Sequence, residues 1–353
     1  MGAITDRCLA MLRRMKEGPA SYPTVINVGA SQVLDTFTPP TLARNESYFA
    51  VRLNQLRLAS GRKWWVQIAP MAFMVAEFQH GRERLAVPFV VGPSMLERFG
   101  QPVPGGMLFD DTVIVGLHPY KGGRIAITAI LYEVPRSDEA RRLLSFVEKA
   151  ASVVGAATAM GTYLKVADVV LDGLEGLLGL DGVRPVAGRR FEVDPDLADD
   201  LGTGWFVLAD GDLKPENVWV KDHRLQYKHA DGGGFYDVPD VDLLLYSLVS
   251  APRRTDIEQL DFHPTIREAE TQAHADASDD GWKRAKAIMT TAFTQIIDSA
   301  DLTMRQGDEL RAEWRKRLVT LHEEALANAH MGPGDDDVER ARAFADATSI
   351  LDL

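Results

Sequence analysis

The spacing of apolar residues alternates between that of strands and that of helices along this chain, and this alternation constrains the fold more than any other feature. From about residue 20 to about residue 135, apolar side chains alternate with polar or small ones, as in Phe49, Val51 and Leu53, a period typical of strands with one buried face. Between residues 146 and 178 apolar residues recur every three or four positions, which is the spacing of a helix. Strand-like segments return between residues 190 and 249. The pattern therefore predicts a helical segment between two runs of antiparallel strands.

The helical segment carries one continuous apolar stripe. Its members are Phe146, Ala150, Val153, Ala157, Met160, Leu164, Ala167, Leu171, Leu174 and Leu178. A single straight helix of the 42 residues between positions 137 and 180 would be about 63 Å long, which exceeds the width of a domain of this size. Glycines at 155, 161, 173 and 176 would each weaken the helix interior by about 1 kcal/mol. We therefore expect two helices, or one bent helix, packed on the sheet.

The last third of the chain has helical composition over residues 257–273, 282–299 and 309–330, and Asp279 or Asp280 can cap the second of these helices. The predicted fold class is α+β: an antiparallel β-sheet or sandwich with a central helical insertion packed on it and a C-terminal helical domain. We divide the chain into an N-terminal helix (1–20), a β-rich core domain (21–252) that includes helices within 137–180, a helical C-terminal domain (253–330), and an acidic linker with a terminal tip (331–353).

Two hairpins can be located from turn residues. Residues 112–118 and 124–134 are separated by a short segment that ends in Gly122 and Gly123, and glycines supply the positive backbone angles that a tight reversal needs. Residues 217–220 and 225–229 are joined by a turn at Lys221-Asp222-His223. Both pairs are expected to form antiparallel strands.

Composition excludes several classes of protein. The 39 Lys and Arg residues against 51 Asp and Glu residues give a net charge of −12, and without a basic run we expect no nucleic-acid partner. The single cysteine, Cys8, excludes an intrachain disulfide and a cysteine-based zinc site. The first residues lack the apolar core of a signal peptide. No run of 18 apolar residues occurs, so we expect a cytoplasmic protein.

One segment contains residues suited to phosphoryl transfer. It reads Asp210-Gly211-Asp212-Leu213-Lys214-Pro215-Glu216-Asn217 and is followed by Asp231-Gly232-Gly233. The segment resembles the catalytic loop of protein kinases and related small-molecule phosphotransferases, in which an Asp orients the acceptor hydroxyl, a Lys steadies the phosphate, and an Asn shares magnesium with a later Asp. The resemblance assigns these roles to Asp212, Lys214, Asn217 and Asp231. It implies Asn217 and Asp231 as metal ligands, and Mg and ATP as cofactors.

The same segment departs from that family at several positions. Asp210 stands where the family usually has His, and the triplet at Asp231 lacks the usual Phe. Upstream, we find no glycine-rich strand-turn-strand with a paired Lys and Glu to bind the nucleotide. Pro, Asn and Asp are also common in turns. We therefore interpret the segment as a polar turn, with no catalytic residue, metal or cofactor, and keep the phosphotransferase as the alternative.

Two other features indicate binding surfaces. Trp64 and Trp65 are adjacent, and adjacent strand residues point to opposite faces, so at most one of them is a core residue and the other marks a partner surface. The apolar tip, with Leu351 and Leu353, either docks into a partner groove or caps its own domain.

These observations predict a non-catalytic cytoplasmic scaffold or interaction protein that binds a protein partner or forms a homo-oligomer. The first alternative is a divergent kinase-like phosphotransferase that uses Mg and a nucleotide. The second is a membrane-interacting protein that uses the amphipathic helices at 146–178. Acidic residues at 168, 172 and 175 would be repelled by anionic lipid, so we do not expect a membrane partner.

Overall fold

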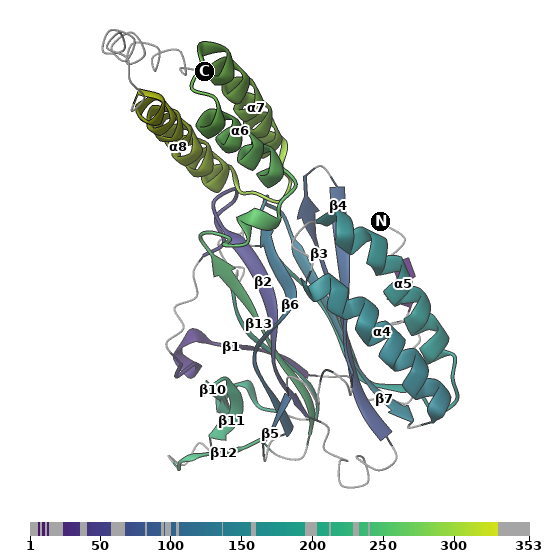
Figure 1. Ribbon diagram of the computed structural model, residues 1–353. Helices are drawn as coiled ribbons and strands as arrows, with labels where there is room; N and C mark the ends of the chain where they lie inside the picture. Colours follow the sequence, from purple (N-terminus) through teal and green to yellow (C-terminus); the bar gives the residue numbers. More distant parts are fainter. Residues whose placement is uncertain are drawn as a thin grey trace. The chain divides into compact units, whose positions relative to one another are not determined.

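The computed structural model describes residues 6–7, 9–10, 13, 24–35, 41–57, 68–81, 83–92, 95, 100–103, 106–135, 137–156, 160–194, 203–211, 213–228, 233–238 and 241–330. The chain divides into two compact units, Met1–Arg254 and Thr255–Leu353 (Figure 1). The first unit contains the strands and two long helices, and the second is helical. These are the elements of the predicted α+β fold.

Two antiparallel sheets form the centre of the first unit. The large sheet has the strand order β1-β9-β13-β2-β6-β5. Its strands are β1 (Thr24–Val28), β9 (Gly204–Asp210), β13 (Asp242–Ala251), β2 (Tyr48–Arg57), β6 (Gly106–Pro119) and β5 (Gly100–Val103). The second sheet has the order β4-β3-β7-β8. We call it the helix-covered sheet, because two helices pack on one of its faces. Its strands are β4 (Glu83–Val91), β3 (Ile68–His80), β7 (Ile125–Pro135) and β8 (Arg184–Val193).

The two sheets pack face to face as a sandwich around one apolar core. Alternate residues of each strand point into this core, as the period of two predicts. Phe49 and Leu53 of β2 lie in the same buried cluster as Met74 and Phe78 of β3. Full burial of each such side chain contributes about 1.5–3 kcal/mol, so this cluster is a main source of the unit's stability.

Two helices pack on the face of the helix-covered sheet that points away from the large sheet. These are α4 (Asp138–Ala156) and α5 (Met160–Leu178), which lie side by side on the sheet in Figure 1. Phe73 and Val75 of β3 form a buried cluster with Val147 of α4 and Leu174 of α5. The predicted insertion is therefore present, as two helices rather than one bent helix.

One residue of the predicted apolar stripe lies elsewhere. Phe146 was expected on the buried side, but its side chain is 51% exposed, whereas Leu144 and Val147 of the same helix are buried. The buried side of α4 is therefore rotated from the stripe, because the residues that face the sheet are set by packing against β3 and β4.

A third, small sheet packs on part of the other face of the large sheet, over β1, β9 and β13. It has the order β10-β11-β12, with β10 (Val218–Lys221), β11 (Arg224–Lys228) and β12 (Phe235–Asp237). Val220 of β10 and Leu225 of β11 are buried together with Val207 of β9. The hairpin predicted around residues 221–223 is β10–β11. The hairpin predicted between 112 and 134 was wrong: β6 pairs with β2 and β5 in the large sheet, whereas β7 pairs with β3 and β8 in the helix-covered sheet, so the chain crosses from one sheet to the other at Gly122 and Gly123.

The second unit is built from α6 (His263–Ala275), α7 (Asp279–Asp298) and α8 (Met304–His330). Trp282, Met289 and Leu318 belong to its own buried cluster. Ser278 caps α7, because its Oγ accepts a hydrogen bond from the Gly281 N–H at 3.1 Å. The predicted cap at Asp279 or Asp280 was wrong by one residue. Within the described parts of the chain, no helix is both long and apolar enough to span a membrane.

Candidate functional site on the small sheet

Only some of the candidate site residues selected from the sequence belong to the described part of the chain. Six of them lie outside the described residues: Trp64, Trp65, Asp212, Asp231, Leu351 and Leu353. Lys214 is exposed just before β10. Asn217 is half-buried, and its Nδ2 donates a hydrogen bond to the Tyr227 hydroxyl at 2.8 Å. This contact attaches Asn217 to the β10–β11 hairpin.

The outward face of the small sheet gathers aromatic and basic side chains. Strand alternation explains this, because Val218, Val220 and Leu225 point into the core and their neighbours along each strand point outward. Cross-strand pairing places Trp219 beside Gln226 and Lys228 beside Phe235. We call this surface the aromatic–lysine face. Its residues are Trp219, Lys221, Arg224, Gln226, Lys228, Phe235 and Asp237.

Two aromatic rings and two ammonium groups are in contact on this face. The ring centroids of Trp219 and Phe235 are 5.7 Å apart, in an edge-to-face arrangement with an interplanar angle of 69°. The Nζ atom of Lys228 lies over both rings, 5.1 Å from the centroid of Trp219 and 5.4 Å from that of Phe235. The Nζ atom of Lys221 lies 5.7 Å from the centroid of Phe235. At these distances the rings attract the cations.

The charges on the face do not cancel among the described residues. Arg224 pairs with Asp237 across β11 and β12, with 3.5 Å between Nη2 and Oδ1. Lys221 and Lys228 form no ion pair with any carboxylate in the described part of the chain. Counting only the described residues, the face therefore carries two uncompensated positive charges, in a chain whose net charge is −12.

A segment near the start of the chain, residues 32–35, holds the hairpin in place. The Nε2 atom of Gln32 donates to the backbone oxygens of Pro215 and Val218, both at 2.8 Å. The Leu34 N–H donates to the Val220 oxygen at 2.9 Å, next to a parallel bridge between Val33 and Val220. These contacts cover the outer edge of β10.

The turn of the hairpin is fixed by a carboxylate of the same segment. Asp222 and His223 have positive φ angles of 53° and 58°, as a two-residue turn of type I′ requires. Their backbone N–H groups donate to the two carboxylate oxygens of Asp35, at 2.6 and 2.9 Å. Non-glycine residues rarely adopt this conformation, and the carboxylate holds both of them in it. On the buried side, the Leu225 N–H donates to Oε1 of Gln55 at 2.8 Å.

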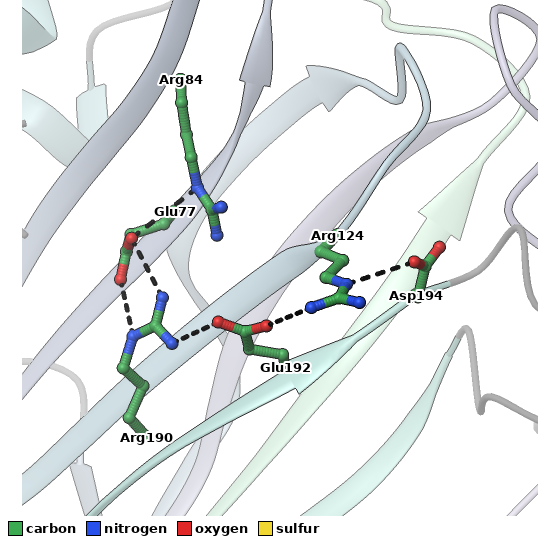
Figure 2. A network of polar contacts seen from close by, with 6 residues as sticks. All are labelled: Glu77, Arg84, Arg124, Arg190, Glu192 and Asp194. Atoms are coloured by element: carbon green, nitrogen blue, oxygen red, sulfur yellow. Dashed lines mark hydrogen bonds and ion pairs between the residues drawn. The ribbon is translucent and has the colours of Figure 1, made fainter. Parts of the chain in front are cut away.

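A second polar cluster lies on the helix-covered sheet. Figure 2 shows Arg190 between Glu77 and Glu192, and Arg124 between Glu192 and Asp194. Arg190 donates to both oxygens of Glu77, at 3.0 and 3.2 Å. The hydrogen bond from Arg190 contributes most to holding the pKa of Glu192 below its usual range.

The third arginine of this network is Arg84, whose Nε lies 3.8 Å from Oε2 of Glu77. Three arginines thus face three carboxylates, and the charges of the cluster balance. We assign it a structural role in joining β3, β4 and β8.

No group of three or more His, Cys, Asp or Glu side chains placed to hold a metal ion occurs among the described residues.

Comparison with known proteins returns no match: no family model, no curated protein and no solved structure is similar to this chain. The aromatic–lysine face was not selected from the sequence, although a signal for it was present. Trp219 and Lys221 alternate with two buried valines in Val218-Trp219-Val220-Lys221. A tryptophan on the outward side of a predicted hairpin strand is the feature that would have identified the surface.

Proposed function

We propose that the protein is a non-catalytic cytoplasmic interaction protein that binds another protein, or a second copy of itself, through the aromatic–lysine face. One observation carries the proposal: Trp219 and Phe235 stand together on the outward side of the small sheet, beneath two lysines that form no described ion pair. Tryptophan and other aromatic residues are enriched in the centres of protein interfaces. A half-buried aromatic pair of this kind is suited to complete its burial against a partner.

The way the face is built supports the same function. Asp35, Gln32 and Gln55 hold the hairpin by hydrogen bonds from other parts of the unit. A surface that is already ordered loses less conformational entropy when it binds. The hairpin is thus suited to present its aromatic side chains in one arrangement.

Site-specific photo-crosslinking tests this proposal. A photoreactive residue is placed at Asp237, whose side chain is 47% exposed at the edge of the face, and a control at Lys283 on α7, which is 72% exposed. We expect one protein, or a second copy of this chain, to be captured from position 237 and not from position 283. Light scattering after size-exclusion chromatography separates these two cases.

Binding of the purified partner then decides the role of the face. We expect the variant with Trp219→Ala and Phe235→Ala to lose this binding while its circular dichroism spectrum stays that of the native protein. Equal binding by the folded double variant, or no capture at position 237 above that at 283, would overturn the proposal.

The phosphotransferase alternative has a direct test of its own. The Nδ2 of Asn217 attaches it to the hairpin, and because the segment departs from the kinase pattern at Asp210 and after Asp231, we expect no magnesium site there. Thermal melting with millimolar ATP and magnesium is then expected to show no change in Tm. A rise in Tm that disappears in an Asp231→Ala variant would support the enzyme instead.

The membrane alternative requires the helices to leave the sheet. Val147, Leu171 and Leu174 are buried against it, and exposing them to lipid would break this packing. We therefore expect the protein to stay in the supernatant when liposomes with anionic lipid are sedimented.

A further inference from the structure

We infer that the ligand of the aromatic–lysine face is an acidic peptide segment, whose carboxylates pair with Lys221 and Lys228. This inference rests on the proposed function and names the chemistry of the partner. The starting point is the charge of the face. Arg224 is compensated by Asp237 at 3.5 Å, whereas the two lysines have only aromatic partners in the described part of the chain.

The position of the two ammonium groups suits carboxylates. Each ammonium has three N–H donors, and an aromatic ring satisfies only its inner side, so donors remain for a ligand. Both ammonium groups lie over the same Phe235 ring, at 5.7 and 5.4 Å from its centroid, and one short segment can therefore reach both. In an extended peptide, side chains two residues apart lie on one side at about 7 Å. Acidic residues at alternate positions of such a peptide can therefore reach both ammonium groups.

The aromatic rings supply the rest of the contact. Trp219 and Phe235 are half-buried and meet edge to face, and the aliphatic stems of the lysines lie beside them. A peptide whose carboxylates reach the ammonium groups would cover these apolar surfaces with its backbone and small side chains. Burial from water strengthens the ion pairs, because the effective dielectric constant falls.

The same geometry argues against a single-stranded nucleic acid as the ligand. Bases bind to such sheets by stacking on open aromatic faces. Here Lys228 lies over both rings and Lys221 over one of them, so those ring faces are occupied by cations. Nucleic acids also need an extended basic surface, and a chain with a net charge of −12 repels a polyanion at long range. An acidic peptide needs only two carboxylates at this face, one for each lysine.

Fluorescence anisotropy with defined probes tests the inference. The first probe is a fluorescein-labelled peptide of about ten residues in which glutamate alternates with alanine. The second has glutamine in place of every glutamate, and the third is a labelled oligothymidylate of similar length. We expect the full-length protein to bind the first probe, with an affinity that falls as salt rises, and to bind the other two at least about tenfold more weakly.

A pair of lysine variants provides the matched comparison. The variant with Lys221→Gln and Lys228→Gln removes both cations of the face. The control is Lys286→Gln, because the Nζ of Lys286 lies 5.4 Å from the ring centroid of Trp282 on α7 in the same kind of contact. We expect the double variant to bind the acidic peptide about tenfold more weakly, and the control to bind like the wild type.

Three results would overturn the inference: equal binding of the glutamate and glutamine peptides, equal binding by the double variant, or binding of oligothymidylate in preference to the acidic peptide. Its failure can be distinguished from failure of the proposed function. If the acidic peptide fails while capture and binding of a protein still depend on Trp219 and Phe235, only the chemistry of the ligand is wrong. If binding of the captured protein is also indifferent to those residues, both proposals fail.

Discussion

The imidazole of His322 stacks on the indole of Trp282 in the C-terminal unit, with ring centroids 4.4 Å apart and planes 9° apart. The side chain is 2% exposed. Burial lowers the pKa of His322, and it outweighs a backbone hydrogen bond with Ala273 and the nearby carboxylates of Asp276, Asp279 and Glu323, which raise it. His322 is therefore neutral in the folded protein at neutral pH.

This shift makes the stability of the C-terminal unit depend on pH. The unfolded chain has an ordinary histidine pKa of about 6.5, and the folded-state value lies below it. The contribution of neutral His322 to the free energy of unfolding is complete above about pH 6.5. It is lost as the pH falls from there toward the folded-state pKa. We expect Tm to decrease between about pH 7.5 and pH 5.5, and His322→Phe, which keeps an aromatic ring, to reduce this decrease. His274→Gln is the control, because His274 is exposed on α6 and should leave the pH profile unchanged.

Asp35 provides a second prediction at the residue scale. Its carboxylate accepts the two N–H groups of a turn whose residues have positive φ. Hydrogen bonds to a charged group contribute about 1.5–3 kcal/mol, so Asp35→Ala should lower the free energy of unfolding by about 2 kcal/mol. Asp222→Gly should do the opposite by up to about 1 kcal/mol, because glycine adopts the positive φ without strain. Urea unfolding measures both; a neutral Asp35→Ala would show that the turn does not depend on the carboxylate.

At the scale of elements, the contact between α4 and α5 depends on Gly173. A Cβ atom at this position would lie 2.6 Å from Cγ2 of Val147, whereas one at Gly176, on the same helix, would have no atom within 4 Å. Gly173→Ala should therefore destabilise the protein by about 1–3 kcal/mol through overpacking. Gly176→Ala should stabilise it by up to about 1 kcal/mol, because alanine favours the helix. Chemical denaturation compares the two variants, and a destabilising Gly176→Ala would contradict this account.

Elements with a strong local period could be predicted from the sequence, and their partners could not. Alternation identified β2, and turn residues identified the β10–β11 hairpin. Pairing of β13 with both β2 and β9 joins segments far apart in the chain, and no local pattern specifies it. The exposed Phe146 has the same explanation, since the face that α4 buries is chosen by the sheet beneath it.

At the scale of the whole molecule, the net charge does not predict where positive charges gather on the surface. A net charge of −12 is an average over the chain. Lys221 and Lys228 come together only because β10 and β11 pair and turn the same faces outward. The candidate site could thus have been found from the sequence only by assigning the residues of the hairpin to its two faces. The hydrogen bonds from Gln32 and to Asp35 that hold the hairpin come from a segment far away in the sequence, and no local pattern predicts them.

The two units have separate buried clusters, and this leads to the last prediction. The buried cluster of the C-terminal unit begins at Leu260 and contains no residue from the sheets. A fragment of residues 255–330 should therefore fold by itself, with a helical circular dichroism spectrum and a cooperative melting transition. Within the fragment, Trp282→Ala should abolish this cooperativity, because it removes a large side chain that is 5% exposed, whereas Lys283→Ala at the exposed neighbouring position should not. A fragment without cooperative melting would mean that the helical unit needs the rest of the chain in order to fold.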